Sequence, residues 1–72
     1  MDFRLNPNKI ALKLISLREQ KGVTQSEVAA ALGVTRSAIN QYEAGVRVPA
    51  DEIKIKIADY FDTSVQDIFY VK

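Results

Sequence analysis

The amino-acid sequence predicts an all-α domain of five helices. Apolar residues recur at the three- and four-residue spacings of a helix face, residues that cap helix N-termini precede these runs, and glycines follow three of them. The chain of 72 residues contains no repeat, low-complexity tract or linker. We therefore interpret residues 1–72 as a single domain.

The first predicted helix spans about residues 7–21. Asn6 is a suitable N-cap, and Pro7 fits the first helical position, where its missing N–H costs nothing. An apolar stripe at positions i, i+4 and i+7 consists of Ile10, Leu14 and Leu17. Gly22 ends the helix, because glycine readily adopts the left-handed conformation of a C-cap.

Two short helices follow, with one glycine between them. Thr24 and Glu27 have the spacing of a capping box, which starts a helix that ends at this glycine. Thr35 caps the next helix, which covers about residues 36–43 and is closed by Gly45. The predicted inward-facing residues are Val28, Ala29 and Leu32 in the first helix of the pair and Ala38, Ile39 and Tyr42 in the second.

Residues 50–61, ADEIKIKIADYF, fit two different patterns. Ile53, Ile55 and Ile57 alternate with lysines, which is typical of a half-buried strand. However, the acidic residues at the start suit a helix N-terminus, and Ile53, Ile57 and Phe61 sustain a helical face for longer than the alternation lasts. We interpret the segment as the fourth helix.

A short fifth helix is predicted near the C-terminus. Ser64, with Asp67 three residues later, is a variant of the capping box. The helix that follows would carry Val65, Ile68 and Phe69. The last residues, FYVK, are β-prone, so a short extended segment at this terminus is an alternative.

The composition excludes several classes of function. Cysteine and histidine are absent, which removes the usual thiolate and imidazole metal ligands, two nucleophiles and the common general base. We therefore expect no enzyme activity, no metal site and no cofactor. No apolar run approaches the roughly 20 residues of a membrane span, and MDFRLNPNK lacks the pattern of an export signal. We expect a soluble, cytoplasmic protein with no membrane partner and no evident small-molecule ligand.

Charge is distributed unevenly along the chain, although the net charge is only +1. Residues 1–48 contain seven Lys/Arg and four Asp/Glu, net +3, whereas residues 49–72 contain three and five, net −2. A basic half suits a partner such as nucleic acid. The same asymmetry arises by chance in globular domains, so it does not decide the function.

The two short helices must cross steeply, because a connection of a few residues around a glycine cannot make them antiparallel. This helix-turn-helix arrangement, over about residues 24–43, leaves the outer face of its second helix free to enter the DNA major groove. That face carries Arg36, Ser37, Asn40 and Gln41. Arginine can pair with guanine, asparagine or glutamine with adenine, and serine with either. Spacing alone leaves open the alternative that these are merely solvated surface residues.

Many residue types also occur in the order and spacing of a known family. They are Leu17-Arg18, Gly22-Val23-Thr24-Gln25, Val28-Ala29, Leu32-Gly33-Val34, Ser37-Ala38-Ile39, Tyr42-Glu43 with Gly45, Pro49, Ile57-Ala58, and Phe61 with Ser64. In these positions the sequence resembles the lambda-repressor-like, Cro/CI-type helix-turn-helix regulators, also called the XRE family. The resemblance covers about residues 10–69 and implies a five-helix domain that binds double-stranded DNA.

The resemblance implies a role for individual side chains. Gln25 would contact a DNA phosphate beside the N-terminal amides of the second helix, and Thr35 and Arg47 would contact phosphates on either side of the third. Base edges would be contacted by Arg36, Ser37 and Gln41, with Asn40 reaching a base or the flanking phosphate. Arg18 and Glu43 would form a partly buried ion pair between the first and third helices; two independent surface charges are the alternative.

Three residues depart from the family pattern. Ala44 stands where asparagine is frequent, which removes one expected phosphate contact. Ala50 replaces the usual Ser/Thr cap, and Asp62 replaces a glycine, although aspartate tolerates the left-handed conformation better than most residues. None of the three lies on the outer face of the third helix.

One half-site read by so small a domain gives modest discrimination between DNA sequences. The resemblance implies dimerisation, because members of that family usually gain specificity by binding as dimers. We expect a homodimeric transcriptional repressor that binds inverted half-sites. The candidate dimer surface consists of Ile68, Phe69, Tyr70 and Val71, with MDFRL as a pairing strand; alternatively, Ile68 and Phe69 complete the core. The rival function is a protein-interaction module, antitoxin-like or an adaptor, with the same fold.

Overall fold

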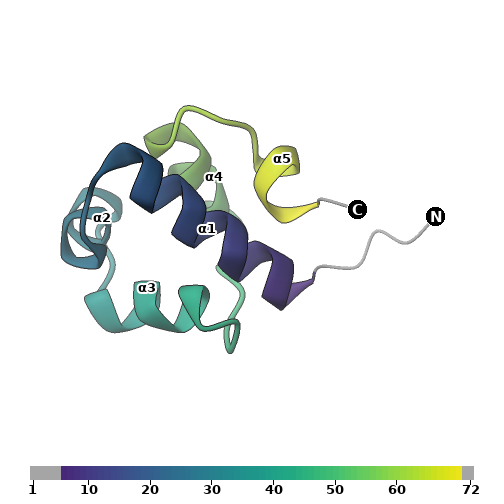
Figure 1. Cartoon of the computed structure of the whole chain (residues 1–72), viewed down its shortest axis with the longest axis horizontal. Coiled ribbons are helices and arrows are strands. Elements are labelled where there is room, and N and C mark those ends of the chain that lie inside the picture. Colours follow the sequence, from purple (N-terminus) through teal and green to yellow (C-terminus); the bar gives the residue numbers. More distant parts are fainter. Residues whose placement is uncertain (1–5, 71–72) are drawn as a thin grey trace.

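The computed structural model describes residues 6–70, which form five α-helices (Figure 1). They are α1 (Pro7–Lys21), α2 (Gln25–Leu32), α3 (Arg36–Glu43), α4 (Asp51–Tyr60) and α5 (Val65–Phe69). The predicted all-α class is confirmed, and the isoleucine-rich segment is a helix and not a strand. Residues 1–5 and 71–72 lie outside the described range, and with them the proposed N-terminal pairing strand and Val71. Between residues 6 and 70, no helix is both long enough and apolar enough to cross a membrane.

Local hydrogen bonds fix the helix starts. Asn6 caps α1 through its side-chain oxygen, with Pro7 in the first turn, as the sequence predicts. Thr24 and Glu27 form the complete capping box of α2, with bonds of 3.0 and 3.1 Å between side chains and backbone amides. Ala50, at the start of α4, makes no side-chain cap bond, so two acidic residues in the first turn support that helix end.

The first four helices end in the same way, with one residue in the left-handed conformation. These residues are Gly22, Gly33, Gly45 and Asp62, with φ between 56° and 75°. The next amide in each case donates to the carbonyl five positions earlier over 2.9 to 3.3 Å, which is a Schellman motif. At Gly45 the backbone also approaches α1, since a Cβ there would lie 3.2 Å from Asn8 Oδ1.

One hydrophobic core joins all five helices. α1 contacts α3 and α5, and α2 contacts α3 and α4, so α3 is held between α1 and α2 while it lies along one edge of the molecule (Figure 1). The buried residues that form this core cluster are Ile10, Leu14, Val28, Ala29, Leu32, Ala38, Ile39, Tyr42, Ile57, Ala58, Ile68 and Phe69. Ile68 and Phe69 are each 1% exposed, so the dimer-surface hypothesis is wrong for these two residues and they complete the core.

Lys54 is a buried residue that the sequence did not predict. Only 5% of it is exposed, and its Nζ lies 3.3 Å from Asp51 Oδ1 and 3.4 Å from the hydroxyl of Tyr70. The same ammonium lies over the rings of Phe69 and Tyr70, at 5.8 and 5.4 Å from their centroids. Ile55, by contrast, is 56% exposed, so α4 does not bury every isoleucine of the alternating pattern.

Candidate nucleic-acid interface

α3 presents one face to the core and another to the surface. The core-facing residues are Ala38, Ile39 and Tyr42. The outer residues are the four that the sequence predicts to contact bases, of which Arg36, Ser37 and Asn40 are exposed and Gln41 is partly exposed. Because the inner face is anchored in the core, the outer side chains project from a fixed helix.

The side chains predicted to contact phosphates lie around this outer face. Gln25 is the first residue of α2, and Thr35 caps α3 by accepting a 3.0 Å hydrogen bond from a first-turn amide. The Thr35 hydroxyl proton is therefore still free to donate. Arg47 donates to Gln41 Oε1 over 3.3 Å, and its guanidinium lies 5.6 Å from the centroid of the Tyr42 ring.

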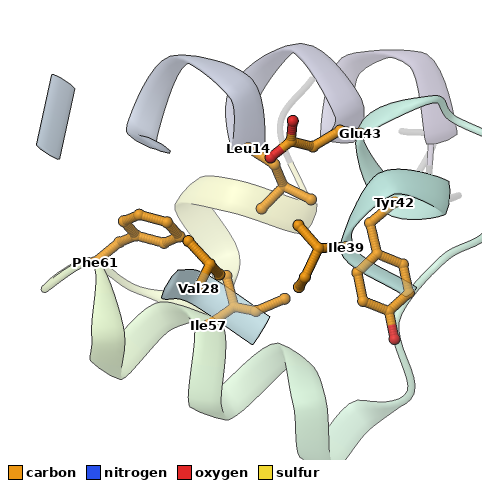
Figure 2. A pocket seen from close by; sticks show the side chains of 7 residues that line it. All are labelled: Leu14, Val28, Ile39, Tyr42, Glu43, Ile57 and Phe61. Atoms are coloured by element: carbon orange, nitrogen blue, oxygen red, sulfur yellow. The ribbon is translucent and has the colours of Figure 1, made fainter. Parts of the chain in front are cut away.

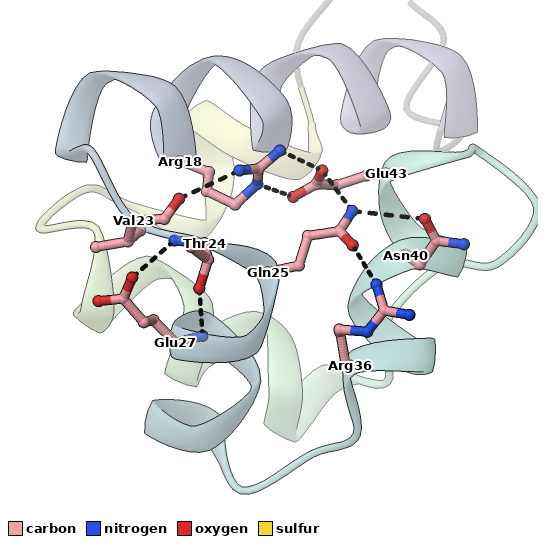
Figure 3. A network of polar contacts seen from close by, with 8 residues as sticks. All are labelled: Arg18, Val23, Thr24, Gln25, Glu27, Arg36, Asn40 and Glu43. Carbon is pink, nitrogen blue, oxygen red and sulfur yellow. Dashed lines mark hydrogen bonds and ion pairs between the residues drawn. The ribbon is translucent and has the colours of Figure 1, made fainter.

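A polar network links the start of α2 to α3 (Figure 3). Gln25 Nε2 donates to Glu43 Oε1 at 3.1 Å and to Asn40 Oδ1 at 3.5 Å. Arg36 Nη1 donates to Gln25 Oε1, also at 3.5 Å. Gln25 thus contacts two of the four candidate base-contacting residues. The resemblance implies only a phosphate contact for Gln25. Its contacts within the chain were missed because the partners lie 11 to 18 positions away, where no local pattern pairs them.

Arg18 and Glu43 lie together at the inner end of this network. Arg18 Nε and Nη2 donate to the two carboxylate oxygens at 2.7 and 3.1 Å, and Nη1 donates to the Val23 carbonyl at 3.2 Å. The side chains are 22% and 7% exposed. The hydrogen bonds that Arg18 donates to Glu43 raise the pKa of Arg18, while burial acts in the opposite direction. This bidentate pair fixes the end of α1 against the end of α3.

The interior offers little space for a ligand. A cavity of about 10 Å³ lies beside Leu14, Val28 and Ile57 (Figure 2), and this volume barely accommodates one water molecule. Its other lining residues are Ile39, Tyr42, Glu43 and Phe61. Over residues 6–70, no group of three or more acidic, Cys or His side chains is placed to hold a metal ion.

Comparison with known families decides what kind of domain carries this geometry. Residues 14–68 match the family model described as Helix-turn-helix. The chain belongs to the Cro/CI-type helix-turn-helix family of DNA-binding transcriptional regulators. This family consists of regulators and not of enzymes.

Related sequences place the Cro/CI-type domain in chains of different length. An uncharacterized HTH-type transcriptional regulator of Methanocaldococcus jannaschii is 37% identical over 57 residues, which are 79% of this chain and 86% of the relative. Two larger archaeal relatives, from Methanosphaerula palustris and Pyrococcus horikoshii, are 42% and 36% identical, but the match covers 17% and 16% of their length. The chain therefore spans about one sixth of those two proteins.

Solved structures of Cro/CI-type architecture match the fold closely. The restriction-modification controller protein C.AhdI from Aeromonas hydrophila has a TM-score of 0.81 and 28% identity, and the match covers 88% of this chain and 96% of that protein. The SOS-response transcriptional repressor LexA from Eubacterium rectale has a TM-score of 0.87 and 25% identity, with 93% and 71% covered. The predicted lambda-repressor-like arrangement of five helices is confirmed.

Proposed function

We propose that the chain binds operator DNA as a homodimer and represses transcription, with α3 of each copy in the major groove of one half-site. The observation that carries this proposal is the division of α3 into two faces. Its inner side chains are buried, whereas its outer side chains are hydrogen-bonding groups of the types that pair with base edges. C.AhdI and LexA, which share the fold, are named as a controller protein and a repressor.

Each outer side chain has a preferred partner in this proposal. Arg36 donates two hydrogen bonds to a guanine, Gln41 pairs with an adenine, and Ser37 contacts either purine. Asn40 reaches an adenine or the flanking phosphate. One bidentate contact discriminates between bases by about 1 to 3 kcal/mol.

Phosphate contacts hold the domain in register. The N-terminus of α2 points its first amides toward the DNA strand that Gln25 contacts, and the partial positive charge of the helix end favours the phosphate. Thr35 donates its free hydroxyl proton, and Arg47 supplies a full positive charge beside the C-terminal end of α3. Binding therefore weakens steeply as salt rises, because each neutralised phosphate releases counterions.

A homodimer supplies the specificity that one small domain lacks. Two copies of α3 in successive major-groove faces stand about 34 Å apart and double the number of bases read. Tyr70, which is 40% exposed, is the remaining described residue of the candidate dimer surface. Repression follows in this proposal when the dimer covers promoter DNA and blocks polymerase.

Selection of bound sequences from a random DNA pool tests the function, followed by titration of the selected site. We expect inverted half-sites and a loss of roughly fivefold or more in affinity for Arg36→Ala and for Gln41→Ala, the lower end of what one base contact supplies. Lys56→Ala, which removes an exposed charge from α4, is the matched control and should have a smaller effect. Unchanged binding by both α3 variants would contradict the assignment of α3.

The salt dependence of binding distinguishes DNA binding from the rival function, a protein-interaction module. A DNA-binding domain should bind random DNA or heparin with an affinity that falls steeply between low and moderate salt. A salt-insensitive complex with a protein, together with no affinity for DNA, would favour the rival.

A further inference from the structure

Glu43 receives hydrogen bonds from two different elements at a single oxygen. Its Oε1 accepts from Arg18 Nη2 and from Gln25 Nε2, both at 3.1 Å (Figure 3). An ionised carboxylate can only accept hydrogen bonds. Glu43 therefore requires Gln25 to turn the NH2 end of its carboxamide inward, and the charge strengthens that requirement.

The rest of the Gln25 carboxamide faces Arg36 and Asn40, two of the candidate base-contacting residues. With its NH2 group turned toward Glu43, Gln25 presents Oε1 to Arg36, whose Nη1 donates to it at 3.5 Å. The second NH2 hydrogen faces Asn40 Oδ1, also at 3.5 Å. Both bonds are longer than the bond to Glu43, so they direct Arg36 and Asn40 without preventing them from turning to a base.

We propose that Glu43 fixes the orientation of the Gln25 carboxamide and thereby positions Arg36 for base recognition. Glu43 and Gln25 are then positioning residues for the outer face of α3. The inference rests on the proposed function, because it presumes that Arg36 contacts a base. A phosphate contact by Gln25 replaces its long bond to Asn40, while the shorter bond to Glu43 keeps the carboxamide in the same orientation.

Replacement of the carboxylate by an amide separates positioning from packing. Glu43→Gln keeps the size of the side chain but no longer requires a donor, so Gln25 can turn its NH2 end toward Arg36. Two donors would then face each other, and Arg36 would lose its acceptor. Arg18→Lys is the matched control, because it also breaks the bidentate pair yet leaves the carboxylate in place.

The experiment measures base preference at one base pair of the operator. This base pair is the one at which Arg36→Ala changes the preference. We expect Glu43→Gln to lose at least about fivefold discrimination there, the lower end of one bidentate contact. Arg18→Lys should stay within about twofold of the original discrimination, since the carboxylate still orients Gln25. Thermal unfolding by circular dichroism verifies that each variant is folded at the temperature of the binding assay.

A second variant keeps the test decisive if Glu43→Gln does not fold. Gln25→Met retains the Arg18–Glu43 pair and the length of the side chain but has no carboxamide, so it should relax preference at the same base pair. Full discrimination in a folded Glu43→Gln or Gln25→Met protein would overturn the inference, as would an equal loss in Arg18→Lys. If Arg36→Ala alters no base preference, the base contact assigned to Arg36 is wrong and the inference fails, whereas the proposed function fails only if Gln41→Ala is also without effect.

Discussion

Arg18 and Glu43 join the last turn of α1 to the last residue of α3 across 25 positions of the sequence. The guanidinium holds both carboxylate oxygens and the Val23 carbonyl, so it also contacts the turn that leads into α2. Three helices of the domain thus meet at one pair of side chains. Loss of the Arg18–Glu43 pair should lower the stability of the fold more than loss of an ordinary surface salt bridge would.

Arg18→Met should lower the free energy of unfolding by about 3 kcal/mol, because it leaves the carboxylate of Glu43 buried without its charged partner. We choose the lower end of the range for buried pairs since Gln25 still donates to Glu43. Urea denaturation measures the change. Lys13→Met on the exposed side of α1 is the matched control and should stay within about 0.5 kcal/mol of the original protein.

The double variant Arg18→Met with Glu43→Met should recover much of this loss, because no unpaired charge remains in the partly buried site. If Arg18→Met alone changed stability by less than about 1 kcal/mol, the pair would behave as a solvent-exposed bridge and the structural argument would be wrong.

The pH dependence of the pair follows from the raised pKa of Arg18. A cation whose pKa is raised by folding makes its full contribution to the free energy of unfolding at pH values below its unfolded pKa. This contribution is lost only as pH rises through the folded pKa. For arginine both values lie above the range in which the domain can be studied. The pair should therefore persist in alkaline solution.

Arg18→Lys makes this dependence visible. Lysine has an ordinary pKa of about 10.4, so its contribution to the pair is lost in the alkaline range where arginine keeps its charge. The difference in unfolding free energy between the original protein and Arg18→Lys should widen from about pH 8 to about pH 11 at constant salt. A constant difference, measured by urea denaturation at each pH, would contradict the expected role of charge.

Lys54→Met should leave stability within about 1 kcal/mol of the original, because Met packs against the rings of Phe69 and Tyr70 and removes the cost of burying a charge. Lys54→Ala should lower it by about 2 kcal/mol through lost packing. Comparison of the two unfolding curves separates the contribution of the aliphatic part of Lys54 to stability from the contribution of its ammonium group. An equal loss in both variants would show that the charged contacts to Asp51 and Tyr70 dominate.

Ala50→Ser should raise the free energy of unfolding by about 0.5 to 1 kcal/mol, because it supplies the missing N-cap of α4. The extended backbone at Ala50, with φ −64° and ψ 160°, suits a capping serine. Ala30→Ser, the same change at an exposed position inside α2, should slightly lower stability. Thermal melts of the two variants should therefore shift in opposite directions.

Local chemistry made the helices predictable. The helix ends are fixed by contacts within a few residues of the chain, so their spacing could be interpreted without knowledge of the tertiary fold. They include the capping box of Thr24 and Glu27 and the left-handed residues, three glycines and Asp62. The outer face of α3 was predictable for the same reason, because a two-turn helix with a buried stripe has only one remaining face.

Contacts between distant residues were not predictable from spacing. Lys54 is buried because the last residue of α5 and the residue after it place two aromatic rings near its ammonium. Its position three residues after Asp51 was nevertheless a detectable sign of pairing. The contact of Gln25 with Glu43 also depends on how α2 crosses α3. Ile68 and Phe69 could have faced solvent or the core, and only the packing of α5 on α1 and α4 decided between these outcomes.

The two faces of α3 have a consequence for how such a domain diversifies. Ser37 can change without disturbing a core residue, so under the proposed function a mutation there would alter the preferred site while the scaffold is retained. Arg36 and Asn40 are different, because both contact Gln25. Epistasis should therefore be strongest between Gln25 and these two positions, and new specificities at them should arise together with compensating changes at the start of α2.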